Sequence, residues 1–410
     1  MTAIDHRHGD TAGVMGRYHL AALFSALFVV GISFGAAAPL VSSILEERGF
    51  SEYYTGAVAA ILALAIAVFS PLAGRLVDRH GVRRLVLWGM LAQALCFAGL
   101  GLALATHEHA LFLARMMLGA SATMTFVAAE VALLRSVPPE SRGRIMSVYG
   151  VAMGAGYAAG VFVAAIAYQH TGLWAFALVG LMAATFTPVA AWGLRHQSMP
   201  EPSPAHTEVA GIGQGRPGLW PLIALGIYGA VVFGGVDTAM SGTFPIEAHR
   251  IGLDRGQIMN IIGVLFIGTL LAQPITGWMA DRLGARPAML SAAIIGLLGC
   301  LGAAWAGLNQ HLGLLFFSWF WVGWAAGAAY PVGLKVLGDR SPPGMLATAN
   351  ARYSGAYGYA SLFGPMLAAG GIDLTGRLQL QGSGVPLVFS SIFVFLFALI
   401  WWDRRRNGGL

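Results

Sequence analysis

The amino-acid sequence predicts an all-α membrane protein whose twelve transmembrane helices form two pseudosymmetric six-helix bundles. Three observations lead to this fold class. Hydrophobic residues make up 57% of the 410 positions and charged residues only 10%, whereas charged residues are about a quarter of an ordinary soluble domain. Apolar segments of about 20 residues, long enough to cross a bilayer, recur along almost the whole chain. A polar motif between two such segments occurs twice, which indicates a duplicated unit.

The predicted spans follow one another through short polar connections, and no strand pattern competes with them. In chain order they cover residues 18–43, 54–76, 84–105, 110–135, 144–169, 172–194, 219–246, 256–280, 287–307, 312–337, 346–371 and 384–402. We expect an N-terminal tail over 1–17, a first bundle over 18–195, a linker over 196–218, a second bundle over 219–403 and a C-terminal tail over 404–410. The linker is rich in Pro, Ser and Gly, a composition typical of flexible connections.

Basic residues are distributed unevenly between the two sides of the predicted spans. Most arginines lie in connections on the same side as the two termini. The connections on the other side hold only Arg48, Arg250, Arg255 and Arg377. By the positive-inside rule, we expect both termini to lie in the cytoplasm. We also expect the chain to cross the cell inner membrane many times. Orientation therefore explains the formal net charge of +6, and no nucleic-acid partner is expected.

The repeated motif has Pro, Gly, Asp, Gly and Arg at identical spacings in both copies. The first copy contains Pro71, Gly74, Asp78, Gly81 and Arg83, and the second contains Pro274, Gly277, Asp281, Gly284 and Arg286. Glycine allows two helix ends to approach closely. The Asp can accept from backbone N–H groups at a neighbouring helix start, and the Arg can hold a carboxylate across a gap. Internal repeats in an apolar chain are typical of transporters.

Two shorter repeats support the duplication. Ser51 precedes the second span as Asp254 precedes the eighth, and both residue types are good helix N-caps. A Pro-Pro pair follows the fourth span and another follows the tenth. The two halves therefore share helix-capping and turn residues as well as the polar motif.

The first copy, Gly74-Arg-Leu-Val-Asp78-Arg-His-Gly81-Val-Arg83-Arg84, resembles motif A of the major facilitator superfamily, which that family repeats between helices 8 and 9. The resemblance covers nearly the whole chain except the tails and the linker. It implies the twelve-helix fold of that family and secondary active transport by alternating access, in a branch like the drug:proton antiporters. No phosphate-binding loop is present in the sequence, so we expect an ion gradient to supply the energy and no cofactor to be needed.

Charged side chains in the middle of a span cost about 2.5–3.5 kcal/mol on insertion scales, so each needs a function or a partner. Asp237 in the seventh span is the first choice for a proton-titrating or substrate-binding group; the alternative is an Asp hydrogen-bonded to a neighbouring helix. Arg115 in the fourth span resembles the arginine of motif B, which implies a place near the cavity and a part in handling protons or substrate charge. Leu118 stands where that motif has Gln, and a structural arginine is the alternative.

Further polar and aromatic side chains are candidates for a central cavity. They are Asn260 and Gln273 in the eighth span, Trp324 in the tenth and Tyr357 in the eleventh. An aromatic-lined cavity suits an amphipathic or planar solute. The alternative for each aromatic residue is packing against lipid or a neighbouring helix.

The resemblance also implies a latch on the cytoplasmic side. In family members with motif A, an acidic residue near the position of Glu130 holds the loop arginine, here Arg83. Asp78 is expected close to the start of the eleventh span, where Arg352 lies. The predicted latch of the outward-open state comprises Gly74, Asp78, Gly81, Arg83, Glu130, Arg352, Gly277, Asp281, Gly284 and Arg286.

Three functions remain after these observations. The fifth span resembles motif C of the antiporter branch, but Tyr157 and Val161 replace its Pro and final Gly. We expect a monomer in the lipid bilayer that exports a small amphipathic organic molecule in exchange for protons, with proton-coupled uptake of a small organic solute as the alternative. A receptor or scaffold with the same fold is a third possibility. The sequence holds no enzymatic nucleophile motif or metal-ligand cluster, so no enzyme and no metal site are predicted.

Overall fold

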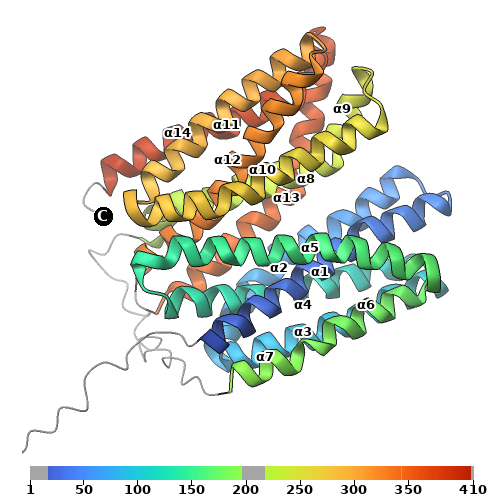
Figure 1. The fold of residues 1–410 in the computed structure, drawn as a ribbon, viewed down its shortest axis with the longest axis vertical. Coiled ribbons are helices and arrows are strands. Elements are labelled where there is room, and N and C mark those ends of the chain that lie inside the picture. Colours follow the sequence, from blue (N-terminus) through green and yellow to red (C-terminus); the bar gives the residue numbers. More distant parts are fainter. Residues whose placement is uncertain (1–16, 196–217, 343, 408–410) are drawn as a thin grey trace, which may run out of the picture.

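The computed structural model describes residues 17–195, 218–342 and 344–407. Two helical bundles lie side by side, the N-terminal one in blue and green and the C-terminal one in yellow to red (Figure 1). The N-terminal bundle comprises α1 (Arg17–Glu47), α2 (Glu52–His80), α3 (Val82–Thr106), α4 (Ala110–Ser136), the 3₁₀ turn η1 (Pro139–Ser141), α5 (Arg142–Thr171), α6 (Trp174–Thr185) and α7 (Thr187–Gly193). The C-terminal bundle comprises α8 (Leu219–Gly242), α9 (Phe244–Arg250), α10 (Arg255–Leu283), α11 (Ala285–Leu308), α12 (Leu312–Arg340), α13 (Leu346–Arg377) and α14 (Gly384–Arg406). The predicted all-α fold is confirmed.

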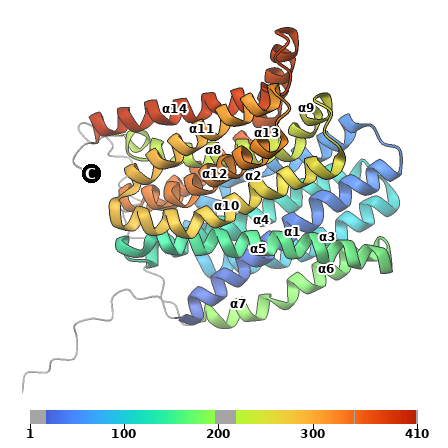
Figure 2. The ribbon, with the colours of Figure 1, turned by 45° about the horizontal axis from the view of Figure 1, so that its top comes forward.

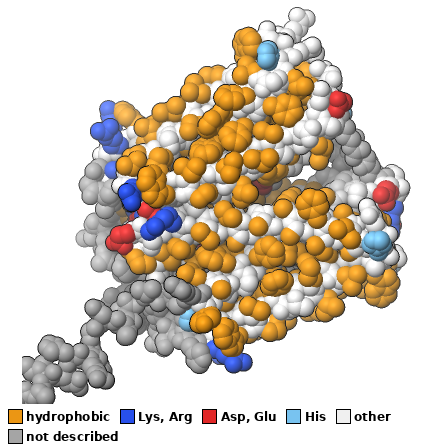
Figure 3. Space-filling model, viewed as in Figure 1, with side chains coloured by type: hydrophobic (Ala, Val, Ile, Leu, Met, Phe, Trp, Pro, Cys, Tyr) orange, Lys and Arg blue, Asp and Glu red, His pale blue; other side chains and the backbone are white. Residues whose placement is uncertain are grey.

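Eleven helical segments in the described part of the chain are long and apolar enough to cross a membrane. The segment Trp174–Gly193, which combines α6 and α7, is one of them. The predicted span that is not among these eleven is the eleventh, 346–371, which corresponds to α13; this helix is 32 residues long but less apolar than the other long helices. Large apolar side chains are exposed over the outer faces of both bundles (Figure 3), as expected of surfaces in contact with lipid.

Two predicted spans are broken near one end by proline. Pro188 lies in the first turn of α7 and Pro245 in the first turn of α9, so the predicted helices 172–194 and 219–246 each divide in two. Proline lacks an N–H donor and fits the first turn of a helix but not its interior. The predicted N-caps are confirmed: the side chain of Ser51 accepts from the backbone of Tyr54, and Asp254 forms a capping box at the start of α10.

Parts of three predicted segments lie outside the described residues. These are the N-terminal tail up to residue 16, the linker from 196 to 217, and the last three residues of the C-terminal tail. The chain leaves the first bundle at Arg195 and re-enters the second at Gly218. We call the end of the molecule that carries these two residues the linker end.

The two most extensive contacts between the bundles are those of α2 with α13 and of α5 with α10, and smaller ones join α4 to α12 and α13, and α5 to α12. Figure 2 shows α5 and α10 running side by side. The first glycine of each motif copy lies at one of these contacts. A Cβ atom at Gly74 of α2 would lie 2.8 Å from the Cβ of Ala351 in α13. One at Gly277 of α10 would overlap Gly143 of α5, so both glycines permit the close approach of the opposite bundle.

The second glycine of each copy makes a tight turn instead. Gly81 joins α2 to α3 with φ 81°, and Gly284 joins α10 to α11 with φ 94°. Side chains with a Cβ are strained in this left-handed region. The repeated motif therefore combines a seam contact with a turn, once in each bundle.

Candidate functional site

A cavity of about 450 Å³ lies between the two bundles. Its walls come from α1, α4 and α5 on one side and from α8, α10, α12 and α13 on the other. Figure 3 shows the hollow between the bundles opening at the end opposite the linker end. Aromatic side chains dominate the lining: Phe34, Phe126, Tyr149, Tyr157, Phe162, Phe233, Phe266, Tyr330 and Tyr357. A space of this size and character suits a small organic molecule.

Few polar groups face this apolar space. Asp237 of α8 is the one acidic side chain in the lining formed by the described residues, and its carboxylate accepts a hydrogen bond of 3.4 Å from the hydroxyl of Tyr357. Gln273 of α10 also lines the cavity, and its side-chain oxygen has no hydrogen-bond partner among the described residues. The structure thus brings together three of the six predicted cavity residues: Asp237, Gln273 and Tyr357.

Asn260 and Trp324 do not belong to the lining. Asn260 is exposed on α10 and is not among the residues of that helix that line the cavity. The ring of Trp324 packs against those of Phe320 and Trp321, with centroids 6.3 and 5.6 Å apart. The lining therefore does not support the predicted cavity role of Asn260, and for Trp324 the alternative of packing against neighbouring side chains replaces it.

Arg115 is buried in α4, only 1% exposed, and does not line the cavity. Its Nε and Nη1 atoms have no hydrogen-bond partner among the described residues. A buried guanidinium with unpaired donors is costly. Arg115 is therefore a buried charged residue outside the lining of the cavity.

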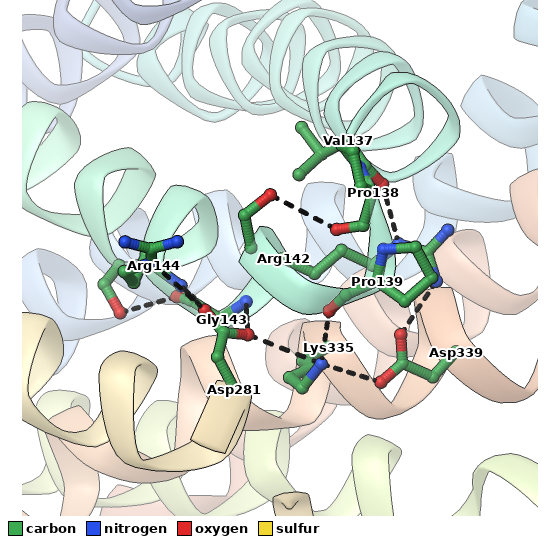
Figure 4. Close-up of polar contacts among 11 residues, drawn as sticks. Val137, Pro138, Pro139, Arg142, Gly143, Arg144, Asp281, Lys335 and Asp339 are labelled. Carbon is green, nitrogen blue, oxygen red and sulfur yellow. Dashed lines mark hydrogen bonds and ion pairs between the residues drawn. The ribbon is translucent and has the colours of Figure 1, made fainter. Parts of the chain in front are cut away.

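At the linker end, the second motif copy closes the seam between the bundles (Figure 4). The carboxylate of Asp281 accepts hydrogen bonds from the backbone N–H groups of Gly143, at 2.7 Å, and Arg144, at 2.9 Å. These groups belong to the first turn of α5 in the other bundle. A carboxylate at a helix N-terminus is favoured by the unpaired N–H groups and by the helix dipole. Asp281 therefore caps a helix across the seam.

Four charged side chains surround this cap, the first being that of Arg144, whose Nε atom lies 3.6 Å from the Asp281 carboxylate. The Nζ atom of Lys335 lies 3.4 Å from Asp281 and 3.0 Å from Asp339, and it donates to the carbonyl oxygen of Pro139 at 2.7 Å. Arg142 donates to Asp339 across the seam at 2.7 Å. Sequence analysis did not single out Arg142, Lys335 or Asp339, because each lies near the end of a helix, where charged residues are common in membrane proteins. One pattern in the sequence could have pointed to them: Lys335 and Asp339 are four residues apart near the end of a span, a spacing at which opposite charges pair on a helix.

The first motif copy has different partners. Asp78 forms an ion pair of 2.8 Å with Arg135 of α4, in the same bundle. Arg83 is exposed. In the second copy, Arg286 instead pairs at 2.7 Å with Asp403 of α14, a residue that is 0% exposed.

The predicted clamp between Glu130 and Arg83 is not formed. Glu130 is fully buried. Arg135, five residues later on α4, points towards α2, where it pairs with Asp78. Five residues correspond to a rotation of about 140° around the helix, so Glu130 points away from α2 and towards the seam. Its carboxylate accepts from Tyr149 and Tyr330, at 2.7 and 2.9 Å, on one oxygen. Its other oxygen accepts from Asn350 at 2.8 Å and Ser354 at 3.3 Å.

Arg352 is exposed near the start of α13, and its guanidinium lies over the ring of Trp220, 5.6 Å from the centroid. The predicted latch residues are therefore not one cluster. Gly74, Gly277, Asp281 and Glu130 contact the opposite bundle, whereas the ion pairs of Asp78 and Arg286 lie within their own bundles.

Comparison with known proteins agrees with this architecture. The chain is 25% identical over 363 residues to an uncharacterised MFS-type transporter of Bacillus subtilis, YfkF, covering 87% of this chain and 89% of that protein. It is 25% identical to the 2-nitroimidazole transporter of Escherichia coli, covering 92% of both. Among solved structures, the human organic anion transporter MFSD10 superposes with a TM-score of 0.72 at 18% identity, covering 94% of this chain and 99% of that one.

The family assignment rests on both halves of the chain. The model of the Major Facilitator Superfamily matches residues 23–246 and again residues 226–409. The repeated match corresponds to the two bundles and to the two copies of the polar motif. The chain therefore belongs to the major facilitator superfamily of membrane transporters.

Proposed function

We propose that this protein is a proton-coupled secondary active transporter that works by alternating access and exports a small amphipathic organic molecule in exchange for protons. The observation that carries the proposal is the cavity at the seam, where aromatic and apolar walls surround the carboxyl group of Asp237. The walls suit an apolar body, and the carboxyl group can bind either a proton or a polar group of the solute. The name of the 2-nitroimidazole transporter supports a small aromatic solute.

The contacts at the linker end support a latch. Asp281, Arg142, Lys335 and Asp339 hold the two bundles together there, while the cavity opens at the other end. We assign the linker end to the cytoplasm because Arg135, Arg142 and Arg340 lie near it, in line with the positive-inside rule. On this assignment we propose an outward-facing state in the cell inner membrane, with both termini inside.

Proton-coupled uptake is the second candidate. Tyr157 lines the cavity at the position where motif C of the antiporter branch has Pro, which removes part of the argument for exchange. The direction of flux under an imposed pH gradient separates export from uptake. No flux of any solute would favour a receptor or scaffold.

The test uses purified protein in proteoliposomes with 2-nitroimidazole as the probe. We expect a pH gradient to drive flux of the probe in the wild type. In the Asp237→Asn variant, this gradient-driven flux should fall at least tenfold while the melting temperature stays that of the wild type. Asp373→Asn is the matched control, because Asp373 is an exposed acidic residue outside the cavity. Unchanged coupling in Asp237→Asn would move the proton site elsewhere.

A further inference from the structure

A second buried carboxyl group lies between the cavity and the linker end. Glu130 receives four hydrogen bonds from three helices: Tyr149 on α5, Tyr330 on α12, and Asn350 and Ser354 on α13. Three of these donors belong to the C-terminal bundle, whereas Glu130 belongs to the N-terminal one. Glu130 therefore joins the two bundles at this depth of the seam.

The surroundings of Glu130 are polar but carry no positive charge. The titratable groups that face it are Tyr149, Tyr330 and Tyr353, one from each of the three helices packed against it there. No lysine or arginine contacts it in the part of the chain that the structure describes. A buried carboxylate is usually held by a cation, so this residue is not explained as half of an ion pair.

The partners of Glu130 can serve its ionised form and its protonated form. Hydroxyl groups of tyrosine and serine either donate or accept. The side-chain oxygen of Asn350 has no partner among the described residues, so rotation of this amide would supply an acceptor for a protonated carboxyl group. A proton can therefore be gained or lost at Glu130 without leaving the site unsatisfied.

The site also has a route to each side. Tyr149 and Tyr330 line the cavity and donate directly to Glu130, so one hydroxyl group separates the carboxylate from the cavity. On the other side, the seam continues to the Asp281 cap at the linker end. If the bundles part there, Glu130 loses its three donors from α12 and α13, and cytoplasmic water takes their place.

From this geometry, and resting on the function proposed above, we infer that Glu130 is a second proton-binding carboxyl group of the transport cycle. Facing outward, one carboxylate oxygen forms an O–H bond with a proton delivered by water in the cavity through a tyrosine hydroxyl. When the linker end opens, that O–H bond breaks and the proton passes to cytoplasmic water. In this scheme Asp237 binds a proton or solute in the cavity, whereas Glu130 binds a proton in the seam between the cavity and the linker end.

Infrared difference spectroscopy of the purified protein in lipid nanodiscs tests this assignment without a solute. We expect acidification of the wild type to produce carbonyl-stretch bands of protonated carboxyl groups. One band should disappear in Glu130→Gln and a different one in Asp237→Asn, while Asp373→Asn retains both. Tyr330→Phe keeps the carboxyl group but removes a hydrogen bond, so the Glu130 band should shift in frequency rather than vanish.

A functional arm separates the inference from the proposed function. In proteoliposomes, Glu130→Gln should lose flux of 2-nitroimidazole driven by a pH gradient at least tenfold but retain exchange of labelled for unlabelled probe. Identical acid-induced spectra for wild type and Glu130→Gln would overturn the inference, even if the wild type transports the probe. A Glu130 band in a protein that does not transport the probe would instead refute the solute class and leave the proton site standing.

Discussion

The two copies of the repeated motif have the same residues at the same spacings, yet they brace different parts of the molecule. The ion pair of Asp78 with Arg135 ties α2 to α4 within the N-terminal bundle. The carboxylate of Asp281 crosses the seam and caps α5 of the opposite bundle. The motif therefore supplies an acceptor at each helix end, and the neighbouring helices decide what it binds.

The arginines of the two copies differ in the same way. Arg286 shares the buried carboxylate of Asp403 with Arg340, at 2.7 and 2.6 Å, whereas Arg83 is exposed. An acidic residue near the end of α14 makes this difference. The arginine of the second copy thus pairs with a buried residue of its bundle, whereas the arginine of the first copy lies at the surface.

The largest difference is expected between the two arginines. Arg286→Gln leaves the fully buried Asp403 with one cation fewer, and breaking a buried pair costs about 3–5 kcal/mol. Arg83→Gln should change stability by less than about 0.5 kcal/mol, as surface substitutions usually do. Thermal unfolding in detergent measures both. Equal melting temperatures for the two variants would mean that Asp403 is adequately held by Arg340 and Asn407 alone.

A smaller effect is expected for the seam glycines. Overpacking costs about 1–3 kcal/mol, so Gly277→Ala and Gly74→Ala should both shift the population towards the inward-open state. Gly277 should have the larger effect because its Cβ would overlap the hydroxyl oxygen of Ser147 and the carbonyl oxygen of Gly143. That of Gly74 would lie 2.8 Å from the Ala351 methyl group and 2.9 Å from the Ala347 carbonyl oxygen. Spin labels at Arg84 and Arg404, in a background with Cys96 and Cys300 replaced by Ser, report the separation. Gly99→Ala is the control, since a Cβ there meets open space.

The smallest difference between the two copies is expected for the effects of replacing their aspartates. Asp281→Asn removes a charged acceptor of two backbone N–H groups, worth about 1–3 kcal/mol. Asp78→Asn removes a partly exposed ion pair worth about 0–1 kcal/mol. The same spin labels should show a larger inward-open population for Asp281→Asn. A larger shift for Asp78→Asn would reverse the roles assigned to the two copies.

Sequence predicted the fold well because the signals were long and periodic. Twelve apolar segments and two motif copies define two bundles, and glycine at positions 81 and 284 marks the turns that the backbone makes. The breaks at Pro188 and Pro245 were missed because hydropathy alone runs through a short helix that starts with proline.

The site was harder to predict because its contacts join distant parts of the chain. Asp237 could be found from the cost of an acidic residue in a span. The partners of Glu130 could not, because Tyr330 and Asn350 lie 200 and 220 residues away from it. The resemblance pointed to Arg83 for that carboxylate, and only the rotation of α4 shows that it faces the seam instead.

The comparatively polar character of α13 has a consequence for how the protein is made. This helix emerges late in synthesis, and Asn350 and Ser354 on it find their acceptor on α4 of the first half. In hydrocarbon alone those donors would stay unsatisfied. Because α4 is synthesised before α13, Glu130 is already available as an acceptor when α13 enters the bilayer, and Asn350 and Ser354 need not remain without a partner in lipid.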